Sequence, residues 1–355
     1  MIASMKELID RLHQTHHLEQ HEYRALLAAA ETPLLDYAME RARTVAQENF
    51  GTGIFIRGLI EITNYCRNNC YYCGIRKGNL NVERYRLNRE EILESCRIGH
   101  EIGFRTFVMQ GGEDAALTDD WLVDTIKAIR TEFPDNAITL SLGERTREAY
   151  QRFYDAGANR YLLRHETYNR THYGQLHPAE MSFDHRIQNL RELKEIGFQT
   201  GTGIMVGTPY QTIDHLVEDI MFIEEFRPQM IGLGPYIPQK DTPFAGEPAG
   251  SLEKTLMLLA IFRLMFPKAL IPCTTSLASL TPEGRKLGIL AGANVVMPNL
   301  SPAANRSKYS LYDNKKATGI ESAEGLELLD EQLKSFGYRI SKDRGDYRGP
   351  ETKEK

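Results

Sequence analysis

The sequence predicts an α/β protein built on a complete (β/α)8 TIM barrel with an N-terminal helical extension. From residue 54 onward, short apolar runs typical of strands alternate with longer runs of helical periodicity. Eight strands in strict alternation with helices favour parallel pairing and closure into a barrel. Several predicted helices end in a glycine before an apolar residue, as at Gly103 and Gly197, which suits a left-handed cap ahead of the next strand.

Four regions divide the 355 residues. Residues 1–50 carry apolar residues at helical spacing and are expected to form a helical cap. Residues 51–312 are assigned to the barrel, and residues 313–340 to a C-terminal helical segment. Residues 341–355 are rich in Lys, Arg, Asp, Glu and Gly, and we expect them to form a mobile polar tail.

The barrel elements follow from the same patterns. The expected strands are residues 54–63, 106–110, 137–142, 160–164, 199–206, 230–234, 270–276 and 294–297. The expected helices between them are residues 89–102, 119–132, 144–156, 182–196, 212–226, 251–266 and 282–291. In such a barrel the loops that follow the strands gather at one end, where the fold carries its chemistry.

The composition narrows the class of protein. A formal net charge of −5 and a pI near 6.1 argue against a broad nucleic-acid-binding surface. No apolar run is long enough to span a bilayer, and the N-terminus lacks the apolar core of a signal peptide. The five cysteines are too few and too clustered for a disulfide scaffold. We therefore expect a cytoplasmic protein with reduced thiols.

Three cysteines dominate the first strand-end loop. Cys66, Cys70 and Cys73 form a C-x3-C-x2-C pattern with no fourth ligand nearby in the sequence. A structural zinc site closes four ligands, so three thiolates in one loop suit it poorly. They suit a cubane [4Fe–4S] cluster in which one iron keeps an open position. Buried cysteines, a disulfide or a distorted zinc knuckle remain the alternatives.

The next strand ends also carry polar residues. The second is followed by Gln110-Gly111-Gly112-Glu113, where the glycines allow close backbone approach and the carboxylate can hold an ammonium group. Ser141 and Glu144 follow the third strand, and Arg164 and Glu166 follow the fourth, with Arg186 further along. Charges at a strand end need partners, so a structural ion-pair network is the alternative to a binding site.

The later strands add smaller or apolar candidates. Gly203, Met205 and Gly207 lie on the fifth strand and its turn, which can also be read as an ordinary tight turn. The remaining candidates lie on or after the last strands, where core packing is the alternative: Met230, Thr274, Thr275, Met297, Tyr309 and Tyr312.

The cysteine spacing is the signature of the radical S-adenosylmethionine (SAM) family, and residues 54–312 resemble one subgroup of it. That subgroup includes biotin synthase, methylornithine synthase and a maturase of FeFe-hydrogenase. Residues 62–74, 141–144, 160–167 and 294–299 resemble the maturase most closely. The string Arg164-His165-Glu166-Thr167 discriminates best, because methylornithine synthase looks different there.

The resemblance implies roles for these residues. The three cysteines would hold one [4Fe–4S] cluster that reductively cleaves SAM to a 5′-deoxyadenosyl radical. Tyr72 and the fifth-strand glycines would lie beside the adenine, while the Gly-Gly-Glu element, Arg164, Glu166 and Arg186 would serve the methionyl group. Arg160, a possible anion anchor, would line the substrate cavity with the candidates from the last strands. Because no cysteine follows Cys273, no auxiliary C-terminal cluster is expected.

The resemblance also implies a substrate and partners. The substrate would be a cysteine-bound Fe(CO)2(CN) precursor of the hydrogenase H-cluster. The partners would be a companion tyrosine-cleaving radical SAM maturase, a GTPase scaffold maturase and an electron donor such as ferredoxin or flavodoxin. Two alternatives remain: an amino-acid mutase like methylornithine synthase, and a cluster carrier without catalysis. Lysine turnover would indicate the mutase, and absence of SAM cleavage would indicate the carrier.

Overall fold

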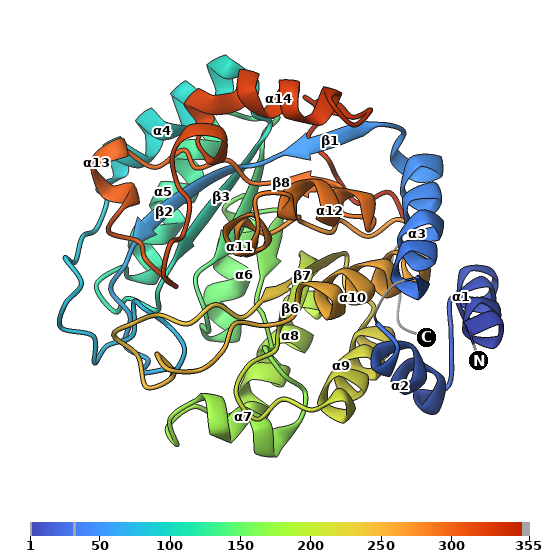
Figure 1. Cartoon of the computed structure of the whole chain (residues 1–355). Helices are drawn as coiled ribbons and strands as arrows, with labels where there is room; N and C mark the ends of the chain where they lie inside the picture. Colours follow the sequence, from blue (N-terminus) through green and yellow to red (C-terminus); the bar gives the residue numbers. More distant parts are fainter. Residues whose placement is uncertain (1, 31–32, 350–355) are drawn as a thin grey trace.

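The computed structural model describes residues 2–30 and 33–349 of the chain. The N-terminal cap consists of three helices, as the apolar spacing predicts: α1 (Ile2–Thr15), α2 (Gln20–Ala28) and α3 (Leu34–Phe50). Helices α1 and α3 pack against α10 and α2 packs against α9, so the cap covers one side of the main body (Figure 1). No helix among the described residues is both long and apolar enough to cross a membrane.

A six-stranded parallel sheet forms the centre of the molecule. Its order β2-β3-β4-β5-β6-β7 follows the order of the strands along the chain. The strands are β2 (Gly58–Thr63), β3 (Thr106–Gly111), β4 (Ala137–Ser141), β5 (Arg160–Leu162), β6 (Gln199–Val206) and β7 (Met230–Pro235). Because every connection returns the chain to a parallel neighbour, the carboxyl ends of all six strands lie at one edge.

Helices connect the strands and begin at side-chain caps. Asn88 and Glu91 form a capping box at the start of α4, and Thr118 caps α5. Gly103 and Gly197 take the left-handed conformation predicted for them, with φ of 110° and 108°. The connecting helices are α4 (Arg89–Ile102), α5 (Asp119–Glu132), α6 (Arg147–Asp155), α7 (Arg170–Leu176), α8 (Phe183–Ile196), α9 (Ile213–Phe226) and α10 (Leu252–Met265).

A second parallel sheet has the order β8-β1-β9. Its strands are β1 (Gly53–Ile56), β8 (Val295–Val296) and β9 (Arg339–Ser341). Isolated bridges link Leu59 of β2 to Asn299 and Met230 of β7 to Leu270, and a further bridge links Pro272 to Val295 of β8. The remaining elements follow β7 in the chain: α11 (Thr275–Leu280), α12 (Gly284–Leu290), α13 (Ala303–Arg306), two 3-10 turns (Gly319–Glu321 and Ala323–Gly325) and α14 (Leu326–Lys334).

The hydrogen-bonded strands therefore do not form one continuous eight-stranded barrel. Two of the predicted strands also differ from the observed ones. The run 54–63 splits at Arg57, where the chain passes from the second sheet to the first. The run 270–276 makes only single bridges, because Pro272 has no N–H to donate and Thr274 already precedes α11.

The polar tail also differs from its prediction. Strand β9 pairs with β1, and the Asp346 carboxylate accepts a hydrogen bond from the buried Arg160. Gly345 packs against Phe55 so closely that a Cβ on it would lie 2.9 Å from the ring. The tail is thus held against the strands at Ser341, Gly345 and Asp346, and residues 350–355 lie outside the described residues.

Candidate active site

A cavity of about 320 Å3 opens at the carboxyl ends of the central strands. Its wall brings together most of the residues predicted from the strand ends. Those that line it are Cys66, Cys70, Tyr72, Cys73, Gln110, Gly111, Gly112, Glu113, Ser141, Arg164, Glu166, Arg186, Met205, Thr274, Met297, Tyr309 and Tyr312. Residues separated by almost 250 positions therefore share one site.

The cysteine loop is fixed against the loop that follows β3. The Arg67 N–H donates to the Glu113 carbonyl at 2.9 Å. A Cβ on Gly112 would lie 2.7 Å from the Cys66 Cβ, so only glycine allows this approach. All three cysteines carry free thiols and are half-buried at the cavity wall.

Burial disfavours the thiolate form of these cysteines. It raises the pKa of the Cys66 and Cys70 thiols and raises the pKa of Cys73 to about 12. A bound metal displaces such protons, because a coordinating thiol is deprotonated outright. In the described part of the chain, no group of three or more His, Cys, Asp or Glu side chains is arranged so that it could hold a single metal ion. Three free thiols from one loop facing one cavity fit the donor set of an iron–sulfur cluster.

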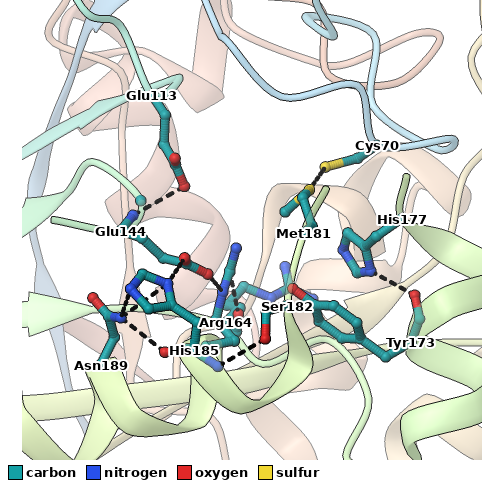
Figure 2. A network of polar contacts seen from close by, with 12 residues as sticks. Cys70, Glu113, Glu144, Arg164, Tyr173, His177, Met181, Ser182, His185 and Asn189 are labelled. Carbon is teal, nitrogen blue, oxygen red and sulfur yellow. Dashed lines mark hydrogen bonds and ion pairs between the residues drawn. The ribbon is translucent and has the colours of Figure 1, made fainter. Parts of the chain in front are cut away.

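Glu113 projects from the loop after β3 towards the next strand end (Figure 2). Its Oε1 accepts a hydrogen bond from the Glu144 N–H at 2.9 Å, and its Oε2 accepts one from Arg67 Nε at 3.0 Å. Gly143, with φ of 71°, makes room for it, since a Cβ there would lie 2.1 Å from the Glu113 Cγ. The loop after β4 therefore orients this carboxylate.

Arg186 connects helix α8 to two strand ends. Its Nη1 donates to the Arg164 carbonyl at 2.8 Å, and its Nε donates to the Glu144 carboxylate. The other oxygen of Glu144 faces His185 on the same helix (Figure 2). Glu144 itself does not line the cavity, so it acts on the site by holding Arg186.

Arg164 and Glu166 face the cavity from the end of β5, and their side chains form an ion pair at 3.2 Å. Arg164 Nε is buried without a hydrogen-bond partner. Glu166 has a φ of 66°, an uncommon conformation for a residue with a Cβ. Such strain and an unpaired guanidinium nitrogen are typical of a ligand site.

His165 points away from the cavity, between its two charged neighbours. Its Nδ1 lies 2.7 Å from Thr202 Oγ1 and its Nε2 lies 3.2 Å from Asp219 Oδ1. Burial lowers the pKa of His165 to about 3, which keeps the ring neutral. The pair with Asp219 fixes this backbone segment, so that Arg164 and Glu166 are held facing the cavity.

Tyr72 is oriented by a residue that the sequence did not indicate. Its hydroxyl lies 3.1 Å from His177 Nε2, and His177 Nδ1 lies 2.9 Å from the Tyr173 carbonyl. Burial lowers the pKa of His177 to about 3, so the ring is neutral. Its one proton belongs on Nδ1, which faces a carbonyl, and Nε2 therefore accepts the Tyr72 hydroxyl.

Met181 is a second residue that sequence reasoning missed. Its sulfur lies 3.6 Å from the Cys70 sulfur, on the segment between α7 and α8 (Figure 2). No strand-end pattern marks either Met181 or His177, because both follow α7 rather than a strand.

The rest of the cavity wall is lined by hydroxyl, thioether and aromatic groups. Thr274 Oγ1 lies 2.9 Å from Ser276 Oγ and donates to the Leu233 carbonyl at 3.2 Å. Tyr309 receives a hydrogen bond from Gln110 Nε2 at 3.4 Å. The charged residues of the wall are Glu113, Arg164, Glu166 and Arg186.

Arg160 and Met230 do not reach this cavity. Both open their strands, β5 and β7, and so lie at the end opposite the strand-end loops. Arg160 is fully buried and binds Asp346 and the Gly345 carbonyl. Met230 packs with Phe55, and its sulfur accepts a hydrogen bond from Arg57 at 3.2 Å. Neither residue lines the cavity at the strand-end loops, so a role in substrate binding stays a prediction for both.

Three smaller candidates also lie outside the cavity wall. A Cβ on Gly203 would lie 1.7 Å from the Gly232 carbonyl oxygen, so this glycine allows β6 to approach β7. Gly207, with φ of 80°, forms the turn after β6, and its N–H donates to Gln211 Oε1 at 2.6 Å. Thr275 begins α11.

Comparison with known proteins gives one matching family and several relatives. The model of the radical SAM superfamily matches residues 60–223. The chain is 41% identical over 304 residues to the [FeFe] hydrogenase maturase subunit HydE of Thermotoga maritima, covering 86% of each. It is 29% identical to the 3-methylornithine synthase of Methanosarcina barkeri, covering 93% of this chain and 91% of that relative.

Solved structures show the same fold. The crystal structure of methylornithine synthase (PylB) superposes with a TM-score of 0.83 at 26% identity, covering 96% of this chain and 98% of that one. The structure of HydG, a maturase of the [FeFe]-hydrogenase, superposes with a TM-score of 0.78 at 24% identity, covering 98% of this chain and 78% of that one. Sequence and fold together establish that the chain belongs to the radical SAM superfamily and is a radical SAM enzyme.

Proposed function

We propose that this enzyme acts in the assembly of the H-cluster of FeFe-hydrogenase, on a cysteine-bound Fe(CO)2(CN) precursor. The proposal rests on the 41% identity to HydE over 86% of the chain. The observation that carries it is a single cavity whose wall holds three free cysteines, four charged side chains and a set of hydroxyl, thioether and aromatic groups.

The cofactor ligands follow from the cysteine loop. Membership of the family implies a [4Fe–4S] cluster and SAM, and Cys66, Cys70 and Cys73 are the residues that would hold the cluster. When bound, such a cluster would supply the electron for reductive cleavage of SAM. Since no cysteine follows Cys273, we propose that the chain holds no auxiliary cluster.

The charged residues of the cavity wall would bind SAM. Glu113, fixed by the Glu144 N–H, offers a carboxylate to the methionyl ammonium group. Arg164 has an unpaired buried nitrogen that can receive the methionyl carboxylate, while Glu166 and Arg186 set its position. Ser141 and the backbone of Gln110, Gly111 and Gly112 complete this wall.

The adenine would lie between the cysteine loop and the end of β6. Tyr72, oriented by His177, and Met205 are the side chains of the cavity wall there. Gly203 and Gly207 would support it indirectly, since they shape the strand and turn that carry Met205. Enclosure by these groups keeps water from a reactive radical.

The rest of the cavity wall would bind the substrate. Thr274 and Ser276 present hydroxyl oxygens there, and Met297, Tyr309 and Tyr312 supply soft and aromatic surface. An amino-acid mutase needs charged partners for the two ends of its substrate, and the four charged residues of the described lining are all assigned here to SAM. This assignment leaves none for an amino-acid substrate and favours the maturase over the mutase.

The setting of the reaction is also part of the proposal. We infer a cytoplasmic location, since thiolate ligands need a reducing compartment. The proposed partners are a tyrosine-cleaving radical SAM maturase, a GTPase scaffold and an electron donor.

The proposal also includes the closed form of the fold. The bridges at Leu59 and Met230 support one (β/α)8 barrel around the cavity.

Anaerobic SAM cleavage tests the function. The reconstituted enzyme is reduced with dithionite, and 5′-deoxyadenosine is quantified with the cysteine-ligated iron precursor, with lysine and with neither. The maturase predicts strong stimulation by the precursor, together with an iron-centred paramagnetic product. Stimulation by lysine instead would assign a mutase, and an intact cluster without any cleavage would assign a carrier.

A further inference from the structure

The loop that carries the cysteines is unusually basic. Residues 64–86, here named the basic loop, contain five Arg or Lys residues and a single carboxylate, Glu83. Arg67 and Arg86 pair with Glu113 and Asp114, while Arg76, Lys77 and Arg84 have no carboxylate partner among the described residues, so the loop keeps a surplus of positive charge. Charge concentrated in this way steers an oppositely charged partner to one place on a surface.

An apolar residue stands at the tip of the basic loop. Leu80 is 92% exposed, the highest value among the large exposed hydrophobic residues of the described chain. Lys77 is exposed beside it, and none of the interactions found among the described residues involves its ammonium group. An exposed leucine flanked by a free cation is suited to a partner with an apolar patch inside an acidic rim.

The tip is nevertheless held in place. Asn79 is buried and donates from Nδ2 to the Gly74 carbonyl at 2.7 Å. Asn81 donates to the Asp241 carboxylate at 2.7 Å, which ties the tip to the loop after β7. Leu80 is therefore presented by a fixed backbone, and a partner loses little conformational entropy by binding it.

The tip contacts the backbone between the cysteines directly. The Lys77 N–H donates to the Asn68 carbonyl at 2.8 Å, and the Gly78 N–H donates to Asn69 Oδ1 at 2.9 Å. The Arg76 N–H donates to the Cys73 carbonyl at 3.1 Å. Hydrogen bonds therefore join the tip to the segment between Cys66 and Cys70. A protein bound at the tip would lie beside the cysteine loop.

We propose that the tip formed by Lys77 and Leu80 is the docking surface for a small acidic electron-transfer protein. The inference rests on the proposed function, because SAM cleavage needs one electron from outside. The donor loses one electron; the sulfonium of SAM receives it, and its C5′–S bond breaks to give methionine and the 5′-deoxyadenosyl group. Electron-transfer encounters use small interfaces with strong electrostatic steering, which suits one leucine within a basic loop.

Two reductants distinguish an effect on docking of the electron donor from an effect on SAM cleavage itself. Cluster-loaded wild type and the variants Lys77→Glu, Leu80→Asp and their combination are supplied either with dithionite or with reduced flavodoxin. The matched control carries Lys127→Glu and Leu328→Asp, which make the same changes on exposed positions of α5 and α14. The formation of 5′-deoxyadenosine is followed at low and high salt.

The proposal predicts a fall of at least tenfold in the flavodoxin-driven rate of the double variant, with the dithionite-driven rate unchanged. The wild-type flavodoxin rate is expected to fall with rising salt, and the control variant to behave as wild type. Equal flavodoxin-driven rates in wild type and double variant would overturn the docking surface, as would an equal loss with both reductants. Failure of the proposed function would show differently, as no cleavage by wild type with dithionite.

Discussion

Lys315 and Glu61 form an ion pair inside the protein, with Nζ 2.6 Å from Oε1 and side-chain exposures of 9% and 0%. Glu61 lies in register with Gln110 of β3, which lines the cavity. The Lys315 ammonium also lies 5.4 Å from the centre of the Tyr309 ring. The pair therefore anchors residues 308–316, here named the closing segment, behind a tyrosine of the cavity wall.

Removing the lysine should be costly. Lys315→Met leaves the Glu61 carboxylate buried with only Asn299 Nδ2 as a side-chain partner at 2.9 Å. We expect a loss of about 3–5 kcal/mol in the free energy of unfolding, measured by denaturant midpoints on cluster-loaded protein. Adding Glu61→Gln should recover part of it, because the uncompensated charge is then gone.

Lys308 provides the matched control within the closing segment. Its bridge to Glu83 is exposed on the carboxylate side, at 73%. Lys308→Met should change stability by no more than about 1 kcal/mol. Equal losses in the two lysine variants would contradict the role assigned to the buried pair.

The contacts of Asp346 predict that the stability of the fold depends on pH. Burial alone raises the pKa of Asp346, but its hydrogen bonds and ion pairs with Arg160 and Arg344 outweigh burial and hold the pKa below its ordinary value. A depressed carboxyl pKa stabilises the fold above the unfolded value of about 3.9, and the gain is lost as pH falls through the folded value. Asp346→Asn should therefore be less stable than wild type at pH 7 by about 1–3 kcal/mol.

That difference should shrink as the pH falls below about 4, because the wild-type carboxyl is then protonated too. Denaturation midpoints of both proteins across the acid range provide the measurement. A difference that stays constant with pH would mean that the charge of Asp346 does not contribute.

Glu113 tests SAM binding. Glu113→Gln keeps an acceptor for the Glu144 N–H but removes the negative charge. A charge-assisted hydrogen bond is worth about 1.5–3 kcal/mol, so the Kd for SAM should rise roughly 10- to 150-fold. Anaerobic equilibrium dialysis measures it, with Glu90→Gln on the exposed face of α4 as control; an unchanged Kd would remove Glu113 from the site.

Substitution of the loop cysteines tests which residues bind the cluster. Alanine at Cys66, Cys70 or Cys73 should abolish stable cluster binding, as measured by iron per chain and by thiolate-to-iron absorbance after reconstitution. Cys96→Ala, in the buried face of α4, should retain both signals. Full iron content in any of the three loop variants would point to another ligand set.

The local elements were largely predictable from the sequence. Helices α4 and α5 begin and end where the periodicity placed them, because Asn88 and Thr118 cap their first turns. The break at Arg57 could not be seen, since residues on both sides are apolar and only tertiary pairing separates β1 from β2. The single bridges of residues 270–276 likewise depend on neighbours distant in the sequence.

Some residues of the site could be predicted from the sequence and others could not. Residues just after strands, such as Glu113 and Arg164, reach the cavity because parallel strands share one edge. Arg160 and Met230 lie outside this cavity because they stand at the first positions of their strands, which the same rule puts at the other end. His177 and Met181 were missed because their approach to the cysteine loop depends on how α7 and α8 pack.

The most direct test of the maturase function is hydrogenase activation in a mixture of purified components. FeFe-hydrogenase apoprotein is incubated anaerobically with the other maturases, reductant and SAM, and hydrogen production is measured with this enzyme, without it, or with its Cys70→Ala variant. The account predicts activation only with the intact enzyme. Equal hydrogen production without the enzyme, or with Cys70→Ala, would contradict it.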